Sequence, residues 1–327
     1  MQPPADLTII AIGGHSLLDP SAPPTVDNQF AVTAATMVPI ADLIERGEHL
    51  ILTHGNGPQV GFMQLRSELA RSEIHEVPLD SLVADSQGSL GYMIQRALRE
   101  ELLRRGMDVE VVTVVTEVEV DVDDQAFDEP TKPIGLFYSK EDAAKLKAER
   151  GWDMIDDAGR GYRQVVPSPT PIRIVQLDTI RRLSESGAIV VCCGGGGIPV
   201  TRNADGHIQG HAAVVDKDRA SALLAVQLRA KRFVITTGVD YVYRSFQTDN
   251  PIPQPQLTVA DVRALNRDGE FPAGSMRPKM ESAIYYLRRC PAEFIVCSPY
   301  NLVQAMDGKS GTHIVLGDQQ DRAPEPS

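Results

Sequence analysis

The sequence has few cysteines, no excess of positive charge and no long apolar run, which are the features typical of secreted, nucleic-acid-binding and membrane-bound proteins. Its 327 residues contain four cysteines and one tryptophan, and its net charge is −12 at pH 7. An acidic chain repels nucleic acids and anionic membranes, so neither is expected as a main partner. The N-terminal MQPPADL lacks the basic and apolar regions of a signal peptide, and no uninterrupted apolar run approaches membrane length. We therefore expect a soluble, cytoplasmic protein.

The cysteines also lack the spacing of a metal site or a disulfide framework. Cys192 and Cys193 are adjacent in an apolar run, Cys290 and Cys297 lie far from them, and none forms a CxxC pair. Such cysteines are typical of buried thiols in a reducing compartment.

Strand-like and helix-like segments alternate along most of the chain. The strand-like runs are short, apolar and mostly rich in β-branched residues, and most stretches between them are amphipathic. Three of these stretches end at a glycine, a common helix C-terminal signal. This alternation predicts an α/β fold: a three-layer sandwich in which helices cover both faces of a largely parallel sheet. Strands are expected within 7–13, 49–55, 109–120, 188–194, 232–238, 293–298 and 312–317, and helices within 30–47, 89–106, 176–187, 219–230 and 280–290.

Residues 119–170 interrupt this alternation. The segment is dense in charge, proline and glycine, with one short helix expected at 139–150. A solvated surface excursion would account for its composition. A small lid subdomain over a cleft is the other interpretation, because lids bring charge to anionic substrates. The residues that favour a lid are basic or aromatic: Lys132, Tyr138, Arg160, Tyr162 and Arg163.

Three glycine loops each follow an apolar run: IGGHS (12–16), HGNGPQVG (54–61) and CGGGGIPV (193–200). One such loop is weak evidence, since glycine clusters usually mark turns. Three loops at the carboxyl ends of strands in one parallel sheet would meet at the edge where α/β folds bind ligands. Without Cβ atoms, their backbone amides can approach and surround phosphate oxygens.

Lysines in three further stretches supply positive charge: Lys132 in EPTKPIG, Lys217 in VVDKDRA and Lys279 in GSMRPKMESA. A lone lysine is normally a surface residue. Lys217, however, lies between two aspartates at the start of a helical run, where Asp216 could orient it. Lys279 also opens a helix, where its charge opposes the helix dipole, so an anionic ligand would explain its presence.

In order and spacing, these motifs resemble those of carbamate kinases in the amino-acid kinase superfamily. The resemblance extends from Leu7 to Gly317 and includes SQGSLGYM, PTKPIG, RGYRQVVPSPTP, GVDYVY and GSMRPKMESA. It implies a homodimeric phosphotransferase of nitrogen metabolism that interconverts ATP and carbamate with ADP and carbamoyl phosphate. It also implies an N-terminal acceptor part (1–205) that includes the lid (119–170), and a C-terminal nucleotide part (206–318). Residues 319–327 are expected to be a disordered tail.

The resemblance also assigns roles to individual residues. Catalysis is implied for Lys132, Lys217 and Lys279, with Asp216 organising Lys217. No protein metal site is implied, and Mg²⁺ would be bound through ATP or ADP. Substrate binding is implied for Gly13, Gly14, His15, Gly55, Asn56, Gly57, Gly195 and Gly196, and nucleotide binding for Asp240, Tyr243, Met276 and Lys279.

The sequence departs from the family pattern at three places. His15-Ser16 replaces Asn-Ala, Ala212-Ala213-Val214 replaces Glu-Ala-Val, and Thr237-Gly238 stands where an aspartate is usual. His15 could donate a hydrogen bond to the phosphoryl group, reshape the pocket for another acceptor, or be a neutral substitution. Three functions therefore stay open: a carbamate kinase, a related kinase that forms an acyl phosphate on another small carboxylate or carbamate, and a catalytically weak nucleotide- or metabolite-binding protein.

Overall fold

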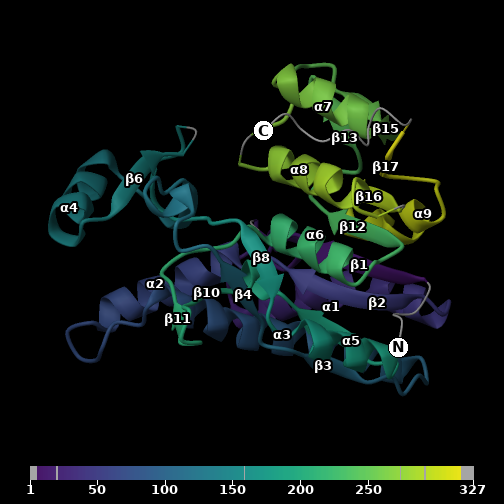
Figure 1. Ribbon diagram of the computed structural model, residues 1–327, viewed down its shortest axis with the longest axis horizontal. Coiled ribbons are helices and arrows are strands. Elements are labelled where there is room, and N and C mark those ends of the chain that lie inside the picture. The colour runs from purple at the N-terminus through teal and green to yellow at the C-terminus, as the bar shows by residue number, and fades with distance from the viewer. Residues whose placement is uncertain (1–5, 20, 158, 273, 291, 318–327) are drawn as a thin grey trace.

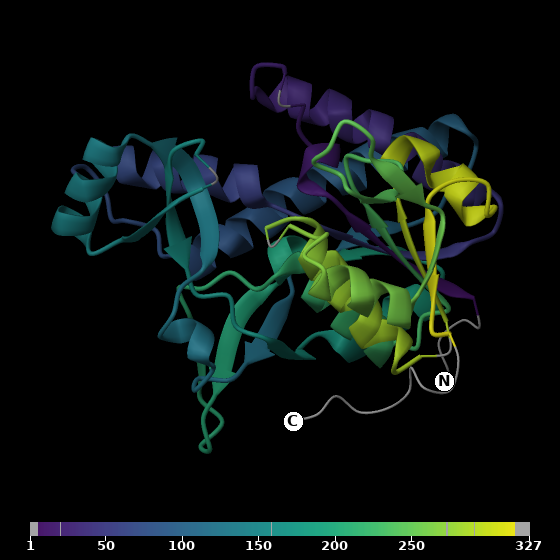
Figure 2. The ribbon, with the colours of Figure 1, turned by 90° about the horizontal axis from the view of Figure 1, so that it is seen from above.

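The computed structural model describes residues 6–19, 21–157, 159–272, 274–290 and 292–317. A central eight-stranded sheet has helices on both faces, and a small subdomain projects from one end (Figures 1 and 2). The strand order is β15-β17-β16-β12-β1-β2-β9-β3. All neighbouring pairs are parallel except β16 with β17, so the predicted largely parallel sheet is confirmed. These strands span Leu7–Ile12 (β1), His49–His54 (β2), Val111–Thr113 (β3), Ile189–Cys192 (β9), Arg232–Thr236 (β12), Gln256–Thr258 (β15), Glu293–Cys297 (β16) and Thr312–Val315 (β17).

The helices are 5 to 26 residues long, and most of them cover this sheet and connect its strands. The three glycines expected at helix ends, Gly47, Gly106 and Gly187, all have positive φ directly after helices. Among the described residues, every helix is too short or too polar to serve as a membrane span. The helices are Val26–Glu45 (α1), Gly57–Ala70 (α2), Leu79–Arg104 (α3), Lys140–Arg150 (α4), Leu177–Glu185 (α5), Lys217–Gln227 (α6), Val259–Arg267 (α7), Met276–Leu287 (α8) and Leu302–Met306 (α9), with 3-10 turns at Gly14–Ser16, Gln125–Phe127, Gly194–Gly196 and Pro299–Asn301.

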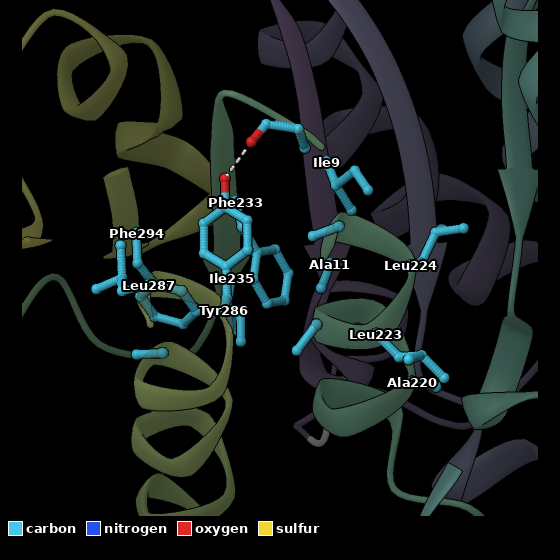
Figure 3. Close-up of a cluster of buried hydrophobic side chains, with 14 of the residues drawn as sticks. Ile9, Ala11, Ala220, Leu223, Leu224, Phe233, Ile235, Tyr286, Leu287 and Phe294 are labelled. Carbon is cyan, nitrogen blue, oxygen red and sulfur yellow. Dashed lines mark hydrogen bonds between the residues drawn. The ribbon is translucent and has the colours of Figure 1, made fainter. Parts of the chain in front are cut away.

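The two larger clusters of the core lie one on each face of the sheet, and a third, smaller cluster packs the projecting subdomain against α2 and α3. Side chains alternate along β1, so Ile9 and Ala11 pack with α6 and α8, whereas Ile10 and Ile12 pack with α1 and α3. On the first face, the ring of Phe233 packs edge-on against Tyr286 and Phe294, with centroids 5.6 and 5.0 Å away (Figure 3). All four cysteines are free and buried, as expected.

The apolar run 109–120 does not form a single strand. Its first part is β3, whereas Glu117–Val120 (β4) belongs to a second sheet of order β11-β10-β4-β8. At the break between β3 and β4, Gln87 of α3 accepts a hydrogen bond from the N–H of Thr116 at 2.7 Å and donates to its carbonyl oxygen at 3.1 Å. The other strands of this sheet are Pro171–Ile174 (β8), Ile198–Arg202 (β10) and Ile208–Gly210 (β11), and a separate hairpin joins Val242–Arg244 (β13) to Ile252–Gln254 (β14).

The projecting subdomain is a three-stranded antiparallel sheet with helix α4. Its strands are Lys132–Tyr138 (β5), Asp153–Asp156 (β6) and Tyr162–Val166 (β7), in the order β5-β7-β6. Within the expected 119–170, the antiparallel sheet and α4 thus occupy 132–166, while residues 119 and 120 are the end of β4 and belong to the second sheet. The helix expected at 139–150 is α4. The tail expected to be disordered, 319–327, lies outside the described residues.

Candidate active site

The three glycine loops meet at the carboxyl edge of the central sheet. The loop after β2 lies against the loop after β1, since a Cβ at Gly55 would be 3.4 Å from the N atom of Gly14. The loop after β9 lies against the same region, since a Cβ at Gly195 would be 2.2 Å from Nδ2 of Asn56. The expectation that these segments converge is confirmed, and part of the reason for their glycines is close backbone packing.

Not all of the expected amide donors are equally available to a ligand. Gly13, Gly55 and Gly196 donate their N–H groups to Thr236 Oγ1, Ile12 O and Cys193 O at 3.3, 3.0 and 3.0 Å. The Asn56 side chain is buried against Gly195 of the third loop and donates to Ser86 Oγ at 2.7 Å, so its amide group is already engaged. The other expected donors are the amides of Gly14, Gly57 and Gly195. Gly57 is the first residue of α2, where the helix end carries partial positive charge.

Lys217 extends along these loops from the start of α6. A Cβ at Gly55 would be 3.5 Å from its Cδ atom, so its stem passes directly beside the second loop. Its Nζ lies 2.6 Å from Oδ1 of Asp218. Burial lowers the pKa of Lys217, and Lys279 lowers it further, while Asp218 opposes both.

Lys279, from the first turn of α8, contacts the other oxygen of the same carboxylate. Its Nζ donates to Oδ2 of Asp218 at 2.9 Å. Burial lowers its pKa, but the charge and hydrogen bond of Asp218 outweigh burial and raise it above the ordinary value. Burial disfavours the charged form of Asp218, yet the two ammonium groups hold its pKa far below the usual range. Asp218 is therefore an ionised bridge between two lysines, and its place directly after Lys217 was the available sequence signal.

Asp216 has a different partner from the one expected. Its Oδ2 accepts a hydrogen bond from Lys132 Nζ at 2.6 Å, and its Oδ1 caps α6 by accepting from the N–H groups of Asp218 and Arg219. The carboxylate in contact with Lys217 is that of Asp218, while Asp216, which was expected to organise Lys217, acts on it through its charge and through the cap of α6. Lys132 lies at the start of β5, so the Asp216 contact joins the projecting subdomain to the site.

A cavity of about 440 Å³ opens on the far side of Lys279. Its lining is largely apolar and includes the expected Tyr243 and Met276. Asp240 lies outside this lining and accepts a hydrogen bond from Asn301 Nδ2 at 2.8 Å. The sequence prediction missed the aromatic and proline residues that complete the cavity. The full lining is Thr237, Gly238, Val239, Tyr243, Phe246, Glu270, Phe271, Pro272, Ser275, Met276 and Lys279.

Two further expectations concern His15 and a metal site. His15 lies in the 3-10 turn Gly14–Ser16, but its side chain is outside what the structure describes. Within the described residues, no group of three or more His, Cys, Asp and Glu side chains is arranged to hold a metal ion. Asp216 and Asp218 are engaged by lysines.

Comparisons with known proteins agree with this geometry. The amino acid kinase family model matches residues 6–298. The carbamate kinase of Staphylococcus haemolyticus is 42% identical over 94% of this chain and 98% of its own length. The carbamate kinase-like protein YahI of Escherichia coli is 41% identical over 95% of this chain and 99% of its own. The solved carbamate kinase of Giardia lamblia bound to AMP-PNP has a TM-score of 0.89 and 36% identity, covering 95% of this chain and 99% of that one. The chain belongs to the amino acid kinase family and, within it, to the carbamate kinases.

Proposed function

We propose that the protein transfers a phosphoryl group between ATP and carbamate, interconverting them with ADP and carbamoyl phosphate. The observation that carries this proposal is the shared carboxylate of Asp218. It holds Lys279, which lines the 440 Å³ cavity, and Lys217, which lies beside the glycine loops. A phosphoryl group that moves from a nucleotide in the cavity to an acceptor at the loops would pass these two cations.

The proposed mechanism is positioning and charge stabilisation. Lys279 would bind the nucleotide phosphates and Lys217 the group in transfer, while Lys132 would reach the acceptor side from β5. The backbone amides of Gly14, Asn56, Gly57 and Gly195 would hold the remaining oxygens. A carbamate oxygen is already anionic, so transfer needs no general base.

The nucleotide would bring Mg²⁺ with it. Lysines and backbone amides bind phosphate oxygens, and the two nearby carboxylates already hold lysines. These groups fit a metal that the nucleotide phosphates would hold, and the metal would supply charge neutralisation. We further propose that the protein is a cytoplasmic homodimer acting in nitrogen metabolism. Its N-terminal part, to about residue 205, would hold the acceptor, and residues 206–318 the nucleotide, although the β10–β11 hairpin crosses that boundary.

The test is ATP formation from ADP with carbamoyl phosphate, beside a panel of other acyl phosphates such as acetyl phosphate. We expect carbamoyl phosphate to give the highest kcat/KM. Preference for another acyl phosphate would indicate the related kinase, and no turnover with any of them would indicate a binding protein.

The His15→Asn variant, which restores the family residue, sharpens this test. If His15 selects another acceptor, the variant gains activity with carbamoyl phosphate and loses it with the true substrate. If His15 donates to the phosphoryl group, an ionisation between about pH 5.5 and 8 disappears from the rate profile. Unchanged rate, pH profile and substrate range would make His15 a neutral substitution.

A further inference from the structure

His54, the first residue of the second glycine loop, was not singled out by sequence reasoning, and its side chain packs against the third loop. It is the last residue of β2 and is 1% exposed. Its Nδ1 lies 3.0 Å from the carbonyl oxygen of Gly55. On its other side the ring fills the space beside the third loop, where a Cβ at Gly194 would be 2.5 Å from Nε2 and 2.7 Å from Cε1. One side chain thus sets the separation of two loops.

The contact with Gly55 defines the tautomer of the His54 ring. A carbonyl oxygen can only accept, so Nδ1 carries the proton and donates it. Burial lowers the pKa of His54 to about 4, and Lys217 on α6 also lowers it. Near neutral pH the ring is therefore uncharged, with its lone pair on Nε2. The other side chains placed near the ring or the loops beside it, Asn56 and Gln87, are uncharged amides.

We propose that His54 is a positioning residue for phosphoryl transfer, whose neutral ring spaces the two glycine loops and leaves Lys217 as the cation of that region. A cationic ring would add a positive charge beside a buried lysine that already faces Lys279. A smaller side chain would let the Gly194 loop move toward β2. Because transfer depends on placement, a shift of about 1 Å can cost roughly 100-fold in rate. The inference rests on the proposed function.

The state of the ring can be tested without any substrate. Long-range ¹H–¹⁵N spectra of the histidine-labelled protein should show His54 with a protonated Nδ1 and a bare Nε2, unchanged from pH 8 to about 5. The signals that vanish in His54→Gln assign it. A ring protonated at Nε2, or one that titrates above pH 5, would overturn the proposal. This result stands whether or not the protein proves to act on carbamoyl phosphate, so the two proposals fail separately.

The kinetic test compares two variants of the ring with a control on the same strand. His54→Leu keeps bulk but has no donor, and should lower kcat by roughly tenfold or more, with the Kd of ADP within about twofold of the parent. His54→Gln, neutral and able to donate, should recover much of that loss. His49→Gln, at the exposed start of β2, should behave like the parent. Parental kcat in His54→Leu, or equal losses of kcat and ADP affinity in both variants, would contradict a positioning role.

Discussion

Two aspartates, two positions apart in the sequence, together orient three lysines. Asp216 caps α6 with one oxygen and holds Lys132 with the other, while Asp218 holds Lys217 and Lys279. Each carboxylate is ionised because cations face it, so together they offset most of the charge of the three ammonium groups. Removing Asp218, which is buried between two lysines, would cost about 3–5 kcal/mol, since both ammonium groups would be left uncompensated.

Lys217 should matter more for turnover than for nucleotide binding. Its stem follows the second glycine loop, away from the residues that line the nucleotide cavity. Lys217→Ala should therefore lower kcat by roughly 100-fold or more, as expected for loss of one preorganised electrostatic group. The Kd of ADP, measured by calorimetry, should change much less. Lys309→Ala, at an exposed lysine, is the control. Near-parental turnover would remove Lys217 from the mechanism.

The two roles of Asp216 can be separated by one substitution. Asparagine caps helices about as well as aspartate, so Asp216→Asn should keep α6 and the fold. It removes the charge that holds Lys132, and we expect kcat to fall roughly tenfold, less than for loss of a group that touches the substrate. Asp178→Asn, on an exposed aspartate in the first turn of α5, is the matched control. A melting temperature far below the parent's would show that the carboxylate is mainly structural.

At the scale of residues, the sequence predicted which lysines lie together in the site but not which ion pairs they form. Lys132, Lys217 and Lys279 are spread over about half of the chain, and their motifs still indicated one site. The pairing of Lys217 with Asp218 depends on the first turn of α6, where Asp216 turns toward the backbone. His54 lacked a signal because a buried histidine at a strand end is usually only part of the core.

At the scale of elements, periodicity located most of the central sheet but not the segments defined by tertiary contacts. The seven apolar runs expected as strands all contain strands of this sheet, since strands buried on both faces read as continuous apolar runs. Helix α2 was missed because its first turn is the second glycine loop itself. Helix α3 begins ten residues earlier than expected, and Gly91 in it allows close contact with Thr113, which a Cβ would approach to 2.2 Å. Helix α7, with its Thr258–Asp261 capping box, was also missed.

The antiparallel pair β16–β17 carries an ion pair that should make stability depend on pH. His313 Nδ1 lies 2.7 Å from Glu293 Oε1. The hydrogen bond to Glu293 raises the pKa of His313, and the hydrogen bond to His313 lowers that of Glu293. The contribution of His313 to the free energy of unfolding is fully present below about pH 6.5 and is lost as pH rises through the raised pKa of this histidine. The contribution of Glu293 is present above about pH 4.5 and is lost as pH falls through its lowered pKa.

His313→Gln should therefore be less stable than the parent by roughly 1 kcal/mol at pH 6, with the difference much smaller at pH 9. This figure is modest because the Glu293 side chain is about one third exposed. Urea unfolding at the two pH values measures it. His75→Gln, in an exposed loop, should match the parent at both. A difference that is equal at pH 6 and pH 9 would contradict the charged pair.

At the scale of the whole molecule, one sheet joins the parts that would hold the acceptor and the nucleotide. β1 pairs with β2 on one side and with β12 on the other, so the glycine loops and Lys217 depend on a shared core. The projecting subdomain is different. It has its own sheet, and in α4 only Ala143 is buried among the described side chains. Its composition left both a solvated excursion and a small subdomain open, and the bounds of the folded unit depend on pairings between distant strands, which the sequence alone did not reveal.

We therefore expect the subdomain to melt before the core. Trp152, the single tryptophan, lies in the subdomain and packs against Tyr138 with centroids 6.4 Å apart, so its fluorescence reports the subdomain and its contact with α2. The fluorescence transition should precede the main calorimetric transition, and ADP should raise the latter more. Arg150→Met removes the partly buried contact between α4 and Glu68 of α2 and should lower the fluorescence transition by roughly 5 °C. Arg46→Met, which removes an exposed pair between α1 and Asp307, should leave that transition unchanged. Coincident transitions in the parent would show that the subdomain and the core unfold as one cooperative unit.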